Sequence, residues 1–253
     1  MIIASTLQKS FGPQTLFDDV SFLINKGERI GLVGKNGTGK STLFKMIMGE
    51  EKQDSGTLST PKGYKIGALD QHIHFTKPTV IDECIEALPT EKQWDHYKAE
   101  IILSGLGFSE QDFQKNPTTF SGGFQVRINL CKALLADPNM LLLDEPTNYL
   151  DIVSLRWLKD YLNKWPGEMM LITHDRDFMD QVTTHTLGLH RRQARKVSGG
   201  TIKFYELIIQ EEETYEQTRK NLENKRKEMQ SLVDRFRAKA SKATMAQSRL
   251  KMM

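Results

Sequence analysis

The order of hydrophobic and polar positions divides the chain into stretches with different periodicities. Residues 2–7, 15–22 and 28–33 alternate weakly or form short apolar runs between turns, which predicts β-strands. Between residues 79 and 113 the apolar positions recur at helical spacing, so we predict a small helical subdomain inserted into the fold. From about Glu206 the chain is polar and lacks proline and glycine, which predicts one long helix.

After the helical subdomain, predicted helices alternate with strongly apolar strands. We predict helices at 128–136 and 154–162, buried strands at 140–145 and 169–173, and a hairpin at 196–204 that turns at Ser198-Gly199-Gly200. Apolar strands that alternate with helices are typical of a parallel sheet, so we predict an α/β fold. We place one domain at residues 1–205, with its helical subdomain at about 79–136, and the long helix at 206–253.

Composition adds only broad limits. The chain of 253 residues is 38% hydrophobic and 26% charged, as expected of a globular protein. No apolar run approaches the roughly 18 residues that cross a bilayer, and the first residues do not resemble a signal peptide. We therefore expect a cytoplasmic protein with no membrane partner. Cys84 and Cys131 lie far apart without metal-like spacing, and we expect free thiols.

The positive charge is concentrated near the end of the chain. Residues 211–253 carry 11 Lys and Arg against 7 Asp and Glu, a balance of +4, whereas the whole chain has a net charge of +3. Met229, Leu232, Val233, Phe236, Ala240 and Ala243 form an apolar stripe, and several basic residues lie on another face. Such a helix either binds the phosphates of nucleic acid or presents a solvated coiled-coil face; we favour nucleic acid.

A glycine-rich segment at 34–41 matches the phosphate-binding pattern G-x-x-x-x-G-K-[ST] at every fixed position. A predicted strand precedes it and a predicted helix follows, which is the context that the motif requires. Backbone amides and the helix dipole would hold phosphate, Lys40 would reach the β- and γ-phosphates, and the Ser41 hydroxyl would bind Mg²⁺. The residues expected to bind the nucleotide here are Gly34, Asn36, Gly37, Gly39, Lys40, Ser41 and Thr42. The alternative is a chance glycine-rich turn.

Two carboxylates, Asp144 and Glu145, end the apolar strand predicted at 140–145. Open α/β sheets bind their ligands at the carboxyl ends of strands. Asp144 suits the Mg²⁺ shell, and Glu145 suits a general base that deprotonates water. The alternative is a helix cap or a turn, which the complete phosphate loop upstream disfavours.

Four weaker candidates each have an ordinary structural explanation. Phe11 could stack on a purine or pack in the core, and Gln71 could reach Mg²⁺ or remain a solvated loop residue. His174, after the strand at 169–173, could hydrogen-bond a γ-phosphate. The turn Ser121-Gly122-Gly123, before a predicted helix, is either a second anion site or a plain helix cap.

As a set, these motifs resemble the ATP-binding cassette (ABC) family over about residues 1–205. The matching order is Phe11, the phosphate loop, Gln71, Ser121-Gly122-Gly123, Asp144-Glu145, Asp151 and His174. The resemblance implies a parallel core sheet with an antiparallel β subdomain and an inserted helical subdomain. It also implies ATP and Mg²⁺ as ligands, ATP hydrolysis, and dimerisation with a second cassette.

The resemblance assigns a role to each weaker candidate. Phe11 would stack on adenine, and Gln71 would contact both Mg²⁺ and the attacking water. Ser121, Gly122 and Gly123 would form the signature motif that grips the γ-phosphate bound by a second cassette. Asp151 would lie in the loop that crosses that dimer interface, and His174 would be the switch histidine.

A narrower resemblance links residues 145–151 and the tail at 234–251 to the ABC-F subfamily. These twin-cassette ATPases include many that bind the ribosome and act on translation. The resemblance implies contacts of the basic linker helix with the ribosome, ribosomal RNA and tRNA. Phe124 and Tyr149 depart from the usual motif residues. The chain ends within a predicted helix, so we expect a first cassette with the start of its linker.

Two other functions compete with this interpretation. The chain could be the ATP-binding subunit of a membrane transporter, which would leave the basic tail without a use. It could also be a non-catalytic interaction module on a cassette scaffold, against which Glu145 and His174 argue.

Overall fold

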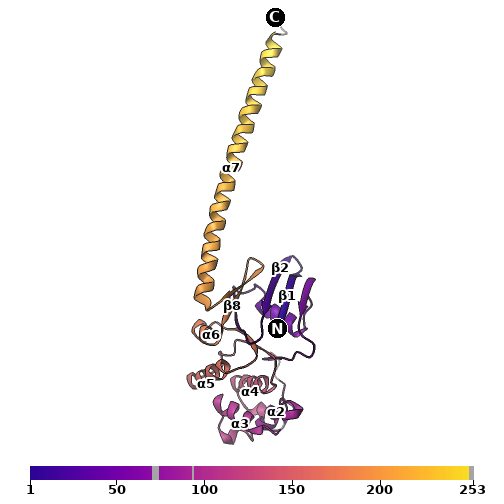
Figure 1. Cartoon of the computed structure of the whole chain (residues 1–253), viewed down its shortest axis with the longest axis vertical. Coiled ribbons are helices and arrows are strands. Elements are labelled where there is room, and N and C mark those ends of the chain that lie inside the picture. Colours follow the sequence, from indigo (N-terminus) through magenta and orange to yellow (C-terminus); the bar gives the residue numbers. More distant parts are fainter. Residues whose placement is uncertain (70–73, 93, 251–253) are drawn as a thin grey trace. The chain divides into compact units, whose positions relative to one another are not determined.

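The computed structural model describes residues 1–69, 74–92 and 94–250, and of residues 232–250 the backbone alone (Figure 1). The chain divides into a compact unit, Met1–Phe204, and a second unit that begins at Tyr205.

An antiparallel sheet of three strands opens the first unit. Its order is β2 (Gln14–Ile24), β1 (Ile2–Phe11) and β4 (Ser55–Ser59). β1 extends beyond the predicted end at residue 7. Its pairing with β2 shifts register between Ala4 and Leu7, and Thr6, which lies in this interval, has a φ of 48°. This irregularity breaks the alternation of apolar and polar side chains on which the prediction depended.

A mixed sheet of six strands forms the centre of the first unit. Its order is β5 (Ile66–Ala68), β6 (Met140–Asp144), β7 (Glu168–Ile172), β3 (Arg29–Gly34), β8 (His185–His190) and β9 (Gln193–Ser198). All neighbouring pairs are parallel except β8 and β9. The predicted α/β class is therefore confirmed. The carboxyl ends of β3, β6 and β7 meet at one edge of this sheet, where the candidate residues lie.

Helix α1 (Lys40–Met48) joins the two sheets through one apolar core. Leu43 and Phe44 of α1 pack in this core with Phe17 of β2 and Met170 of β7, all of them buried. Burial of such side chains stabilises the fold by roughly 1.5–3 kcal/mol each. The core therefore fixes the start of α1 against the ends of the central strands.

Three further helices form a separate cluster, visible in Figure 1 as α2 (Val80–Ile85), α3 (His96–Gly105) and α4 (Gly122–Leu135). Short 3₁₀ turns at Thr90–Lys92, Glu110–Asp112 and Pro117–Thr119 connect them. α4 begins six residues before the predicted start at Ile128, because the Gly122-Gly123 pair forms its first turn. Helices α5 (Ile152–Asn163) and α6 (Arg176–Val182) follow β6 and β7.

The predicted hairpin at 196–204 is wrong. The hairpin joins β8 to β9, and its two loop residues are Arg191 and Arg192, with φ values of 49° and 66°. Such loops usually contain asparagine and glycine, so two arginines gave no turn signal. Gly199 and Gly200 instead lead into α7 (Thr201–Leu250), which begins five residues before the predicted start at Glu206.

Helix α7 is uninterrupted from Thr201 to Leu250. Every side chain from 209 to 231 is exposed, including Met229 and the basic run Lys225-Arg226-Lys227. The remaining residues of the predicted stripe lie where only the backbone is described, so their packing against another helix stays a prediction. Within the described residues, no helix has the length and apolar character needed to cross a bilayer.

Glu28, just before β3, gives the first unit a dependence on pH. Its carboxylate accepts hydrogen bonds from the Asn25 backbone and side-chain amides, both at 2.8 Å, and pairs with Lys196. Burial raises the pKa of Glu28, but the bonds from Asn25 and Lys196 together outweigh burial and lower this pKa to about 2.

Because its pKa is lowered on folding, ionised Glu28 stabilises the fold above pH 4.5, and this contribution is lost as the pH falls toward 2. The free energy of unfolding of the parent should therefore fall as the pH is lowered. We expect this fall to be smaller by roughly 2 kcal/mol in Glu28→Gln. Urea denaturation between pH 2.5 and pH 6 measures it, with exposed Glu50→Gln as the control. Equal pH slopes for parent and Glu28→Gln would contradict the assignment.

Candidate functional site

The phosphate loop lies between β3 and α1, as its motif requires. Gly39 has a φ of 99°, and a Cβ atom there would lie 2.7 Å from the Phe17 ring, so a side chain is excluded on both counts. The Thr38 amide and hydroxyl both donate to the Lys35 carbonyl, at 3.2 and 2.8 Å, and close the loop. The first amides of α1 are therefore held at the edge of an open cavity, where they can receive an anion.

Lys40 and Ser41 connect this loop to the end of β6. The Lys40 Nζ atom donates to the carbonyls of Gly34 at 2.9 Å and Lys35 at 3.3 Å, which holds the ammonium group over the loop. The Ser41 hydroxyl donates to Asp144 Oδ2 at 3.1 Å. Burial raises the pKa of Asp144, and the Ser41 bond and the nearby Lys40 charge oppose that rise.

The Ser41 and Asp144 oxygens fit Mg²⁺ because this hard cation prefers hydroxyl and carboxylate ligands. Within the described part of the chain, no three His, Cys, Asp or Glu side chains are grouped as a metal site.

Glu145 follows β6 in the left-handed region, with a φ of 51°. Its amide donates to the Ile172 carbonyl at 2.8 Å, which ties the residue to β7. Its carboxylate accepts the His174 amide at 3.2 Å and lies 3.5 Å from His174 Nε2. Neighbouring strands therefore aim an acid and a histidine at the same space.

These groups share one cavity of about 570 Å³. Its lining comprises Phe11, Gln14, Leu16, Asn36, Gly37, Gly39, Lys40, Ser41, Thr42, Asp144, Glu145, Ile172 and His174. The sequence singled out most of these residues, but it missed Gln14, which pairs with Phe11 across the β1–β2 turn. Gly34 lies just outside the lining and supplies its carbonyl to Lys40. Gln71 lies outside the described residues.

Phe11 presents a half-exposed ring to this cavity. The Lys9 ammonium group lies over the ring, 4.9 Å from its centroid. Glu51 Oε1, at 2.6 Å, and the Lys52 carbonyl, at 2.7 Å, hold the ammonium group in place. The sequence analysis missed Lys9, whose spacing of two residues from Phe11 on one strand was the available signal.

The residues Ser121, Gly122, Gly123 and Asp151 do not line this cavity. Ser121 is the N-cap residue of α4, and Gly123 lies beside the ring of Tyr149. Asp151 caps α5, with its Oδ1 accepting the Ser154 amide at 2.9 Å. These residues form a second group, apart from the phosphate loop.

Arg127, a buried residue of α4 that the sequence analysis did not single out, joins this second group together. Its guanidinium donates to the carbonyls of Tyr149 and Leu106, both at 2.8 Å, and to Asp151 Oδ2 at 3.2 Å. It also lies over the Phe124 ring at 4.6 Å. The hydrogen bond from the Ser154 amide lowers the pKa of Asp151 most, and the hydrogen bond and charge of Arg127 lower it further. Burial raises this pKa, but the net pKa remains below its ordinary value. A charged residue between the apolar residues Val126 and Ile128 was the available signal.

A phosphate loop that faces carboxylates at the ends of adjacent parallel strands defines a P-loop nucleotide-binding protein. Comparison with known protein families identifies which P-loop proteins this chain resembles. A family model described as ABC transporter matches residues 17–148, and a second model with the same description matches residues 187–253.

Two curated relatives from Escherichia coli K12 extend these matches. The probable ATP-binding protein YheS is 32% identical over 287 residues, covering 100% of this chain and 44% of YheS. The energy-dependent translational throttle protein EttA is 39% identical over 214 residues, covering 83% of this chain and 37% of EttA. The chain therefore belongs to the ABC family and to its ABC-F subfamily. It spans less than half the length of these relatives.

Solved structures show the same fold. One neighbour is the dimeric structure of a post-hydrolysis state of an ATP-binding cassette bound to ADP and Pi. Its TM-score is 0.62 and its identity is 21%, over 78% of this chain and 98% of that one. At this identity, the likeness supports the cassette fold alone.

Proposed function

We propose that the chain binds ATP with Mg²⁺ in the cavity at the phosphate loop and hydrolyses the bond between its β- and γ-phosphates. The contact between the Ser41 hydroxyl and Asp144 carries this proposal, because it brings a hydroxyl and a carboxylate, oxygen groups of the kind that bind Mg²⁺, together beside the loop. Lys40 would exchange its loop carbonyls for the β- and γ-phosphates. The chain belongs to a family of ATP-binding cassettes, which supports the same ligand.

In this mechanism Glu145 accepts a proton from the attacking water, and His174 contacts the γ-phosphate. Mg²⁺, when bound, would stabilise the charge that develops on the phosphate oxygens. Gln71 would contact the metal and the water, and Phe11 would stack on the adenine. Closeness of the Glu145 carboxylate to His174, at 3.5 Å, supports a shared role at one reacting group.

The position of Ser121-Gly122-Gly123 outside the cavity supports a composite site. We propose that this signature motif closes on ATP bound by a second cassette and that Asp151 lies in the interface between the two. The isolated chain is then expected to bind ATP but to hydrolyse it slowly. We propose residues 1–205 as the ATP-binding domain, with its helical subdomain at about 79–136, and residues 206–253 as linker.

Lys40→Ala is expected to weaken ATP binding by about 30-fold, because a charged hydrogen bond to phosphate contributes about 1.5–3 kcal/mol. Isothermal titration calorimetry of the chain with Mg-ATP measures this change in the dissociation constant. Lys45→Ala is the matched control, since Lys45 is exposed in the last turn of the same helix and lies outside the cavity. Unchanged affinity in Lys40→Ala would refute the assignment of the loop.

We further propose that the chain is part of a longer twin-cassette protein, and that this full-length protein acts on the ribosome in the cytoplasm, contacting ribosomal RNA and tRNA through the basic linker. The name of EttA as a translational throttle supports this proposal. The exposed run Lys225-Arg226-Lys227 on α7 also supports it, because clustered cations bind phosphate backbones.

Sedimentation with purified ribosomes tests this second proposal. In the full-length protein carrying Glu145→Gln, ATP is expected to raise the ribosome-bound fraction severalfold over ADP, because ATP would persist in the closed state. Raising the salt concentration should release the protein. Recovery with membranes instead would favour the alternative, an ATP-binding subunit of a transporter.

A further inference from the structure

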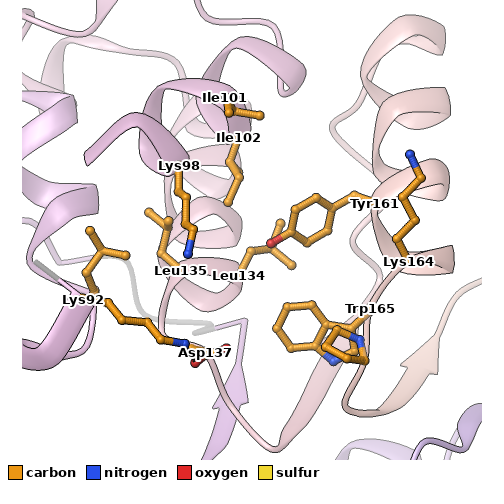
Figure 2. Close-up of a pocket in the computed structure, with 12 residues that line it drawn as sticks. Lys92, Lys98, Ile101, Ile102, Leu134, Leu135, Asp137, Tyr161, Lys164 and Trp165 are labelled. Atoms are coloured by element: carbon orange, nitrogen blue, oxygen red, sulfur yellow. Dashed lines mark hydrogen bonds and ion pairs between the residues drawn. The ribbon is translucent and has the colours of Figure 1, made fainter. Parts of the chain in front are cut away.

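A second cavity, of about 400 Å³, lies between the helical cluster and α5 (Figure 2). It is lined by the C-terminal ends of α4 and α5, which lead into the starts of β6 and β7. The phosphate loop lies at the opposite, carboxyl edge of the same strands. The two cavities share no lining residue, so the nucleotide site does not account for the second one.

Both walls of this second cavity are apolar. Ile102, Leu134 and Leu135, all buried, form the wall made by α3 and α4. The rings of Tyr161 and Trp165 form the facing wall. A volume of about 400 Å³ with apolar walls is within the range of small-molecule sites, about 300–1,000 Å³.

The aromatic wall is held in place by stacking along α5. The Tyr161 ring lies 5.1 Å from the Trp157 ring and 6.1 Å from the Trp165 ring, centroid to centroid. Trp157 in turn packs closely against Gly105 of α3, where a Cβ atom would fall 2.0 Å from the Trp157 ring. This wall is therefore preformed, which lowers the entropic cost of binding a ligand.

The polar groups that remain available in the lining are hydrogen-bond donors. The acid, Asp137, is paired with Lys92, and Lys98 is paired with Asp95 at 2.6 Å. Within the described residues, Lys164 has no ion pair and the Tyr161 hydroxyl has no hydrogen bond. Burial raises the pKa of Tyr161 to about 12, so its hydroxyl remains a donor. Figure 2 shows this hydroxyl directed across the cavity toward Leu134.

The lining combines hydrogen-bond donors that lack acceptors with an apolar surface, and these features indicate the chemistry of a complementary ligand. Because Lys92 and Lys98 are each paired with an aspartate, Lys164 is the lining cation without an ion pair among the described residues, and its positive charge favours an anion. We propose that this cavity binds a small amphipathic organic carboxylate. Its apolar ring or short chain would lie between Leu134 and Trp165, and its carboxylate would accept bonds from the Tyr161 hydroxyl and a rim lysine.

Naphthoate, a planar apolar carboxylate, is a suitable probe, and naphthamide is its neutral counterpart. The chain has three tryptophans, so the indole N–H signals of a ¹⁵N-labelled sample resolve the site. Trp165 lines the cavity, whereas Trp94 is 89% exposed and serves as the internal reference. We expect saturable shifts of the Trp165 signal with a Kd below about 1 mM, and at least about fivefold weaker binding of naphthamide.

Two substitutions test the polar contacts without emptying the cavity. Tyr161→Phe and Lys164→Met should each weaken naphthoate binding by about fivefold and leave naphthamide binding unchanged. Lys159→Met, on α5 but outside the lining, is the matched control. Each variant is first shown to retain the Trp94 and Trp157 signals of the folded parent. The proposal is overturned if naphthoate produces no saturable Trp165 shift, if Trp94 shifts equally, or if both variants bind as the parent does.

Discussion

Glu145→Gln is expected to lower ATP turnover by about a thousandfold and to leave the affinity for ATP within about twofold of the parent value. The substituted amide keeps the size of the carboxylate but cannot accept a proton from water. The proposed phosphate and metal contacts of Lys40, Ser41 and Asp144 do not involve this carboxylate, so binding should persist. Phosphate release by the full-length protein gives the rate, and isothermal titration gives the affinity.

Asp177→Asn is the matched control for this experiment. Asp177 is an exposed acid at the start of α6, three residues from His174, and it does not line the cavity. We expect it to change turnover by less than about twofold. If Glu145→Gln is as active as the parent, Glu145 is not the general base, and another group must activate water.

Arg127→Met is expected to lower the free energy of unfolding of the first unit by about 3 kcal/mol. The substitution removes the separate donors of the Tyr149 and Leu106 carbonyls, Nε and Nη1, and it leaves Asp151 without its cation. The methionine side chain fills part of the space, so the loss reflects mainly the unpaired polar groups. Urea denaturation followed by circular dichroism measures this change.

Arg156→Met is the matched control, because Arg156 is exposed on α5 and we expect a change below about 0.5 kcal/mol. An Arg127→Met variant that is as stable as this control would show that the loop around Asp151 is held by other contacts. If the loss is confirmed, Arg127 couples the start of α4 to the start of α5. Both are segments that we propose to meet a second cassette.

The phosphate loop was predictable because its requirements are local. Gly39 must adopt a positive φ against the Phe17 ring, and Lys40 and Ser41 must begin a helix, so the short motif itself records these constraints. The apolar strand that ends in Asp144 and Glu145 was predictable for a similar reason: its burial on both faces leaves a continuous run of hydrophobic residues.

The features that sequence reasoning missed depend on contacts between distant residues or on unusual backbone. Arg127 acts through carbonyls that are 21 and 22 residues away, and no local pattern records such partners. The Arg191-Arg192 turn adopts positive φ values without asparagine or glycine. At Thr6, a shift in strand register concealed the true length of β1. In each case tertiary structure overrides local preference.

The left-handed backbone conformation of Glu145 lowers the stability of the fold at the residue whose carboxylate we propose as the general base. A glutamate with a φ of 51° costs roughly 1–2 kcal/mol, a cost that glycine would not incur. The Ile172 carbonyl and the His174 amide hold the residue there, on its backbone and its carboxylate respectively. Replacing Glu145 with glycine is thus expected to raise the conformational stability of the first unit, but it would remove the carboxylate that we propose as the general base.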